Sequence, residues 1–149
     1  MKYSYRITKY IQTDELGRGH SSPNEWTSFY DVGNKVTESE YKKVEQKYID
    51  YILDACNCLG VKSLKIKGLE LNVDKYKYAE GSTIQLGDLK EVIQSILREY
   101  IWCKLISNEC EFHFGYDFYM YFLCDACPEE CIDKIKTELT VQRYKSPYL

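Results

Sequence analysis

The chain has seven cysteines, and three of them, Cys124, Cys127 and Cys131, form a cluster whose spacing can carry chemistry. A CxxC pair can be a redox couple or half of a zinc site. A zinc site needs a fourth ligand, which Cys110 or His113 on a neighbouring strand can supply. However, no second CxxC or HxxxH occurs, and the cluster does not follow the first strand of a thioredoxin-like unit. We therefore interpret these cysteines as packing residues and expect no bound metal and no other cofactor.

Cysteine usage and the N-terminal residues also bear on the cellular compartment. The number of cysteines is odd, and no apolar signal-peptide core follows Met1-Lys2-Tyr3. Free cysteine behaves as a small hydrophobe, so we expect all seven thiols to be reduced and most of them buried, in a cytoplasmic protein. No run of about 18 uninterrupted apolar residues occurs, so the sequence predicts no membrane-spanning segment.

Pairs of groups that could act as nucleophile and base are sparse. The two histidines are His20, in a polar stretch, and His113, in an aromatic strand, and neither has an evident nucleophile partner. The carboxylates Glu129 and Glu130 fit the start of a helix. No P-loop, GxGxxG, GxSxG or HExxH motif is present. We therefore predict no enzyme, and a metal- or thiol-dependent enzyme is the third hypothesis, after two kinds of protein-binding function.

Two features of the sequence favour binding to another protein. Near the N-terminus, aromatic residues lie among both acidic and basic residues. Buried anchors at protein interfaces are enriched in Trp, Tyr and Arg. Carboxylates form an acidic edge around the aromatic hairpin expected over 112–122, and complementary charge would speed association with a basic partner. Strand packing explains the aromatic residues equally well, and a solvated sheet edge explains the carboxylates. The partner-binding candidates are Glu109, Glu111, Asp117, Asp125, Tyr10 and Tyr30.

The overall charge narrows the kind of partner. The net charge is −3, and no block of Lys and Arg of the kind that grips phosphates occurs. We therefore expect neither nucleic acid nor a membrane as the partner. A mildly acidic chain suits a basic protein surface, and a small regulatory or scaffold module that binds proteins is the second hypothesis.

Periodicity predicts the elements that must position these groups. Alternation over 2–11 predicts a strand, and an aromatic segment over 25–32 predicts a second strand that pairs with it across a polar loop. Thr37 has capping-box spacing and Gly60 can end a helix, so we expect an amphipathic helix over 38–59. The other expected elements are strands over 61–73, with a bulge at Lys67-Gly68, and over 83–86, a helix over 88–106 with Asp88 as its N-cap, two strands joined at Gly115-Tyr116-Asp117, and a helix from Pro128 to about Leu139.

These elements predict an α+β fold with a mostly antiparallel sheet and about three helices packed on it, in the order β-β-α-β-α-β-β-α. No linker or repeat divides the sequence, so residues 1–149 are expected to form a single globular domain. A length of 149 residues is enough for one well-packed core.

Short motifs near the N-terminus resemble those of a group of bacterial proteins. YRITKY at 5–10, a polar loop, EWTSFYDVG at 25–33 and a TESEY helix start resemble immunity proteins encoded beside polymorphic toxins, including those of contact-dependent growth inhibition systems. The resemblance covers roughly the first third of the chain and assigns no residue roles. It implies a cytoplasmic protein that binds and blocks a toxin's C-terminal domain, often a nuclease with a basic cleft, in a toxin–antitoxin relationship.

Overall fold

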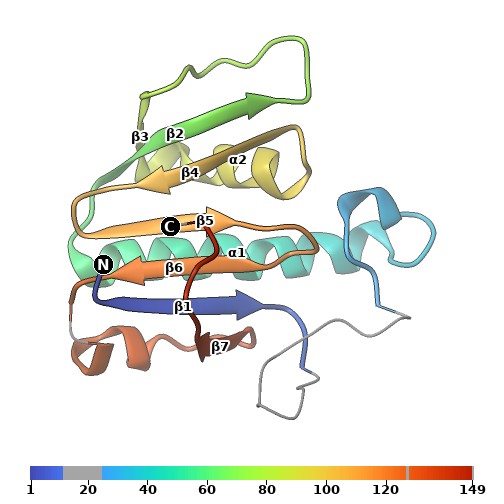
Figure 1. Cartoon of the computed structure of the whole chain (residues 1–149). Coiled ribbons are helices and arrows are strands. Elements are labelled where there is room, and N and C mark those ends of the chain that lie inside the picture. The colour runs from blue at the N-terminus through green and yellow to red at the C-terminus, as the bar shows by residue number, and fades with distance from the viewer. Residues whose placement is uncertain (12–24, 127, 149) are drawn as a thin grey trace.

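The computed structural model describes residues 1–11, 25–126 and 128–148. Seven strands form one antiparallel sheet in the order β3-β2-β4-β5-β6-β1-β7 (Figure 1). The predicted α+β class and antiparallel sheet are confirmed, but the described residues contain two α-helices where we expected three. The strands are β1 (Tyr3–Thr8), β2 (Ser63–Leu71), β3 (Thr83–Gln85), β4 (Ile101–Ile106), β5 (Cys110–Phe114), β6 (Met120–Cys124) and β7 (Thr140–Arg143).

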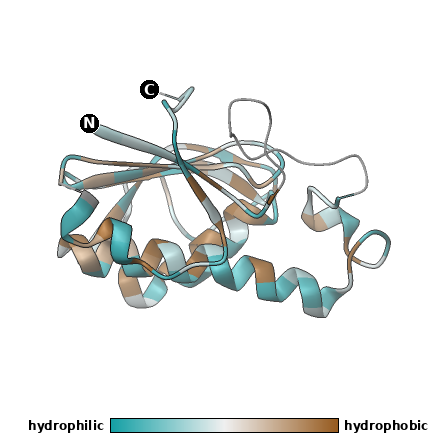
Figure 2. Ribbon diagram, turned by 90° about the horizontal axis from the view of Figure 1, so that it is seen from below, coloured by the Kyte–Doolittle hydropathy of each residue, from teal (hydrophilic) through white to brown (hydrophobic). Residues whose placement is uncertain are grey.

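Both helices lie on the same face of the sheet, which gives the molecule two layers (Figure 2). Strand alternation sends one set of side chains into the core between the layers. Buried residues on this inner face include Ile66 of β2, Leu105 of β4 and Phe122 of β6. None of the described helices lies on the opposite, outer face of the sheet, and the C-terminal segment crosses it. No helix in the described part of the chain is long and apolar enough to cross a membrane.

Helix α1 (Glu38–Leu59) forms where the sequence predicts it. The Thr37 hydroxyl oxygen accepts a hydrogen bond from the backbone N–H of Glu40 at 3.2 Å. Gly60 ends the helix with φ at 71°, a left-handed conformation that glycine adopts without a Cβ clash. The buried side of the helix follows the predicted spacing and includes Tyr41, Tyr48, Ile52 and Ala55.

Only the first part of the helix predicted over 88–106 forms as a helix. Helix α2 (Leu86–Leu97) is followed by β4, whose burial alternates strictly between buried and half-buried positions. The backbone of β4 pairs with β2 on one side and with β5 on the other, so partners distant in sequence override the helical spacing. The helix also begins earlier than predicted. Gln85 is its N-cap, so the assignment of that role to Asp88 is wrong.

The predicted strand over 25–32 is wrong, and its pairing with the first strand does not form. A 3-10 turn, Phe29–Asp31, occupies this segment, because Ser28 and the Asp31 carboxylate satisfy the local backbone N–H groups in a capping box. The half-buried rings of Trp26 and Phe29 pack against Tyr41 of α1. Strand β1 pairs instead with β6 and with β7.

The helix predicted from Pro128 to Leu139 is also wrong. Two 3-10 turns, Pro128–Glu130 and Ile132–Lys134, lead into β7, which pairs with the outer edge of β1. The backbone of β7 completes its hydrogen bonds with β1, so tertiary pairing decides how the chain ends. Ile132 and Leu139 join the core on either side of this connection.

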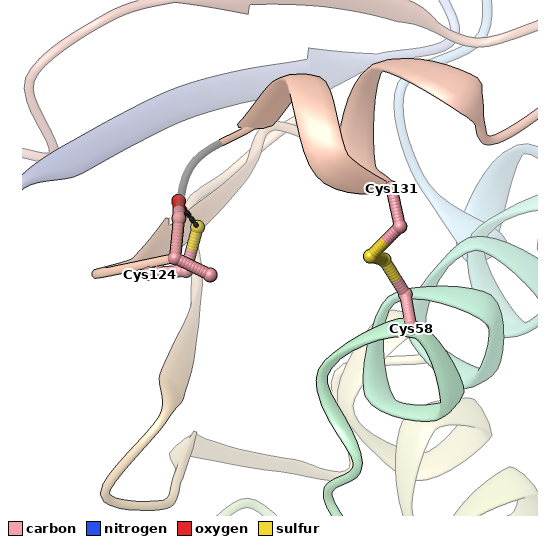
Figure 3. Close-up of a disulfide and its surroundings, with 4 residues drawn as sticks. Cys58, Cys124 and Cys131 are labelled. Atoms are coloured by element: carbon pink, nitrogen blue, oxygen red, sulfur yellow. Dashed lines mark hydrogen bonds between the residues drawn. A yellow bond between two sulfur atoms is a disulfide. The ribbon is translucent and has the colours of Figure 1, made fainter.

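A disulfide between Cys58 and Cys131 contradicts the expectation that all seven thiols are free (Figure 3). The two Cα atoms lie 5.9 Å apart, within the range that a disulfide requires. The bond joins the last turn of α1 to the segment before β7 across 73 residues of sequence. Because the two cysteines belong to distant segments, the spacing of cysteines along the sequence did not indicate that they lie close together. Four further cysteines, Cys56, Cys103, Cys110 and Cys124, are free and buried.

Candidate functional site

The end of β2, the start of β4 and the turn between β5 and β6 lie at the same end of the sheet (Figure 1). A groove opens where these segments meet. Its cavity volume is about 370 Å³. Carboxylates and aromatic rings line it together, which is the composition of a site for a cationic group. The lining includes Glu70, Asn72, Glu99, Trp102, Tyr116 and Tyr148.

The floor of the groove is set by an irregularity in β2. The register with β4 shifts between Lys67 and Glu70, and Gly68 at this bulge has φ of 71°. The bulge was predicted at Lys67-Gly68 and is confirmed. Beyond it, Glu70 lies directly opposite Trp102, so both side chains stand on the outer face. The Trp102 indole N–H donates to the Phe114 carbonyl at 2.8 Å, which holds the ring in place.

Glu99 forms one side of the groove in a backbone conformation that non-glycine residues rarely adopt. Its φ is 63°, its Oε2 accepts a hydrogen bond from the Ser28 hydroxyl at 3.1 Å, and its carbonyl accepts one from the Asn72 side chain at 2.9 Å. Asp117 and Phe118, in the turn across the groove, have φ of 60° and 64°. Within the described residues, every non-glycine residue with positive φ lies at this end of the sheet. Such conformations concentrate at functional sites, because the surrounding structure must hold them.

Exposed aromatic rings lie both at the groove and beyond it. Tyr116 is 81% exposed and Tyr30 is 70% exposed, values that are high for large rings. The Phe29 ring contacts both Tyr30 and Tyr100, and thereby connects the N-terminal 3-10 turn to the start of β4. We call this patch the rim surface, and it consists of Tyr30, Glu70, Glu99, Tyr100, Tyr116 and Asp117.

The structure divides the four carboxylates that the sequence grouped together. Glu109 and Asp125 lie at the end of the β5–β6 pair remote from the rim surface, and the full length of both strands separates them from Asp117. Glu111 lies between the two ends, on the outer face, and its carboxylate is occupied by His113. Of the four, only Asp117 belongs to the rim surface. Charge alone gave no information on which end of the hairpin each residue occupies.

The two predicted tyrosine contacts have different outcomes. Tyr30 is exposed on the rim surface, where a partner can reach it. Tyr10 is fully buried and its hydroxyl donates to the Asp117 carbonyl at 2.5 Å, so its side chain is not exposed to a partner in this structure. This hydrogen bond instead links the segment after β1 to the β5–β6 turn. The groove residues Glu70, Glu99 and Trp102 were missed, because they come together only when β2, α2 and β4 are in place.

Glu111, His113 and Ser146 have the residue types of a hydrolase triad on the outer face. His113 Nε2 lies 2.9 Å from Glu111 Oε1, and His113 Nδ1 lies 2.8 Å from Ser146 Oγ. The His113 and Ser146 side chains are buried, and Ser146 Oγ also accepts the backbone N–H of Tyr148. A substrate therefore has no access to this hydroxyl. These hydrogen bonds hold the C-terminal segment against the outer face of the sheet. Lys104 contributes a further bond, because its Nζ donates to the Tyr148 carbonyl.

The buried position of His113 in these contacts predicts that it makes a pH-dependent contribution to stability. Burial is the largest effect on His113 and lowers its pKa below the ordinary value of about 6.5. As the pH falls below about 6.5, His113 therefore takes up a proton more readily in the unfolded chain than in the folded chain. The free energy of unfolding falls as a result. A His113→Gln variant should lose less stability than the wild type between about pH 7.5 and 5.5, as measured by urea unfolding. An equally steep loss in the variant would contradict the assignment, and His20→Gln is the control.

The C-terminal cysteines do not form the candidate metal site in this structure. Cys131 is in the disulfide and therefore has no thiolate to offer, while Cys127 lies outside the described residues. Cys124 is buried, with its Sγ 3.8 Å from the Ala126 carbonyl (Figure 3), and burial raises the pKa of its thiol to about 11. Within the described residues, no group of three His, Cys, Asp or Glu is arranged to hold a metal ion.

Comparison of the chain with protein-family models, with curated proteins and with solved structures gave no match.

Proposed function

We propose that this protein is an immunity protein, which binds and neutralises the toxin domain of a polymorphic toxin in the cytoplasm. The observation that carries the proposal is the rim surface, which combines exposed tyrosines with carboxylates around a groove. Tyrosine supplies apolar contact area together with a hydrogen-bonding hydroxyl, and buried anchors at interfaces are enriched in it. We propose a binding site and not a catalytic one, since no nucleophile is paired with a base among the groove residues that the structure describes.

Charge supports a basic partner. The rim surface carries the carboxylates of Glu70, Glu99 and Asp117 on a chain of net charge −3. A nuclease toxin must present a basic cleft to its nucleic-acid substrate. An acidic protein that docks on such a cleft gains association rate from charge complementarity and blocks the substrate at the same time. The N-terminal motifs that resemble those of immunity proteins add sequence support, and the 25–33 motif includes Tyr30 of the rim surface.

The proposal predicts direct binding to the C-terminal domain of the toxin encoded by the gene immediately upstream. We expect a one-to-one complex and protection of cells that express the toxin. Neutralising the rim surface with Glu70→Gln and Asp117→Asn should slow association about tenfold at low salt and flatten its salt dependence. Asparagine tolerates the positive φ at position 117, so the turn should persist. Association kinetics at low and high salt measure both effects.

The matched control neutralises two carboxylates at the opposite end of the hairpin, Glu109→Gln and Asp125→Asn. This variant removes the same charge and should associate as the wild type does. If the control slows association and the rim variant does not, the interface lies at the other end of the β5–β6 pair. If the wild-type protein neither binds the toxin nor protects cells, the immunity proposal is wrong, and a regulatory or scaffold function becomes the leading explanation of the rim surface.

A further inference from the structure

Away from the groove, many aromatic rings of this chain already contact the chain's own cations. Such contacts stabilise a positive charge against the electron-rich face of a ring. Within the described residues, no cation of the protein lies over the three rings of the groove, Trp102, Tyr116 and Tyr148. Examples of the paired rings elsewhere are Tyr144 with Arg6 at 4.3 Å, Trp26 with Lys9 at 4.2 Å and Phe29 with Arg98 at 5.0 Å.

The carboxylates of the groove also have oxygen atoms that accept no hydrogen bond from a described residue. Glu70 is exposed and makes no ion pair or side-chain hydrogen bond to any described residue, although it lies directly opposite the Trp102 ring. Glu99 uses one oxygen to accept the Ser28 hydroxyl. The other Glu99 oxygen makes no hydrogen bond to a described residue. The groove therefore brings aromatic faces and unneutralised carboxylate oxygens together around one cavity.

We infer that this groove receives one arginine side chain of the partner protein, with the guanidinium held between the aromatic rings and the carboxylates of Glu70 and Glu99. The inference rests on the proposed function and names the chemistry of its recognition site. It identifies the groove as the part of the rim surface that selects the partner. The surrounding tyrosines, Tyr30 and Tyr100, then contact the surface around that arginine.

The shape and chemistry of the groove favour arginine over other cations. A guanidinium is planar, stacks on aromatic faces and presents several N–H donors to carboxylates, whereas an ammonium is compact and strongly hydrated. The cavity of about 370 Å³ is near the lower end of the range for ligand pockets, which suits one side chain better than a stretch of peptide. A basic cleft that binds nucleic acid exposes arginines of this kind.

The test uses a capped Gly-Arg-Gly peptide and the indole N–H signals of the intact protein in NMR spectra. The chain has two tryptophans, so Trp102 reports on the groove while Trp26, packed against α1, is an internal control. We expect a saturable shift of the Trp102 signal with millimolar affinity and no comparable shift of Trp26. Replacing arginine with citrulline, which keeps the shape and removes the charge, should abolish the shift. Lysine at the same position should bind more weakly than arginine.

Protein variants locate the site and separate this inference from the proposed function. Glu70→Gln should weaken arginine peptide binding roughly two- to fivefold, as expected for a solvent-exposed ion pair, while Glu109→Gln leaves it unchanged. No saturable Trp102 shift, or equal shifts with citrulline or lysine, would overturn the arginine site even if the protein binds its toxin. Conversely, peptide binding at Trp102 without toxin binding would retain the arginine site and reject the immunity function.

Discussion

Replacing Arg98 with methionine is expected to lower the free energy of unfolding by about 3–5 kcal/mol, because it strands a buried carboxylate. The Arg98 guanidinium binds both oxygens of Glu45 at 2.9 Å, and the Glu45 side chain is only 2% exposed. The Tyr41 hydroxyl donates to the same carboxylate at 2.7 Å. Without the guanidinium, Glu45 must remain charged without its main partner or take up a proton. Urea or thermal unfolding at neutral pH measures the loss.

Two further variants show whether the stranded charge causes the loss. Adding Glu45→Gln to Arg98→Met removes the charge itself and should recover much of the lost stability. Lys77→Met breaks the exposed pair between Lys77 and Glu91 and should change stability little, since water solvates both partners. A double variant no more stable than Arg98→Met would mean that packing of the Arg98 stem, and not its charge, accounts for the effect.

The Arg98 pair also connects the core to the rim surface. Its guanidinium lies 5.0 Å from the Phe29 ring, and Phe29 in turn contacts both Tyr30 and Tyr100. Glu99, the next residue, is the strained side of the groove. A loss of order in this segment should therefore accompany the loss of stability in Arg98→Met. We therefore expect the order of the rim surface to depend on the Arg98–Glu45 ion pair.

Breaking the disulfide with Cys58→Ser is expected to cost about 2–5 kcal/mol under oxidising conditions. The bond closes a long loop, because the two cysteines are separated by 73 positions in the sequence, and so restricts the unfolded chain strongly. Unfolding of wild type and variant with and without reductant tests this directly. The stability difference should disappear when the wild-type disulfide is reduced. Equal wild-type stability in both conditions would show that the bond is absent or without consequence.

Chemical labelling gives the matching control and bears on the compartment. Alkylation of the denatured, unreduced protein should modify Cys56, Cys103, Cys110 and Cys124 and leave Cys58 and Cys131 unmodified. The same labelling in living cells tests the proposed cytoplasmic location, because cytoplasmic reductants keep most thiols reduced. A Cys58–Cys131 bond that persists in cells would place the protein in an oxidising compartment.

Elements whose interactions are local were predictable from the sequence. Helix α1 has a stripe of apolar residues, a Thr37 cap and a terminal Gly60, all within a few residues of the backbone that they stabilise. The β5–β6 pair has a short connection, so its strands meet by chain proximity. The bulge at Lys67-Gly68 was visible as a change in the parity of the apolar residues. In these places the sequence pattern and the tertiary environment favour the same structure.

Elements that need a distant partner were not predictable. The 101–106 segment suits a helix by spacing, but β2 and β5 complete its backbone hydrogen bonds as β4. The 25–32 segment has the residues of a strand and becomes a capped turn, because β6 and β7 already occupy both edges of β1. Strand propensity describes fit to a half-buried surface, so it cannot say whether such a surface is free.

The sequence by itself therefore determined the α+β class, the acidic and aromatic character of the chain and the one long helix, since these follow from composition and local periodicity. Only the tertiary structure decided which of its groups meet. Glu70 and Trp102 face one another through strand register, Glu99 joins them at the end of α2, and Tyr148 arrives from the C-terminal segment. Such a groove is made by segments up to 78 positions apart, counted from Glu70 to Tyr148. Contacts at that separation depend on the completed sheet, which no local pattern encodes.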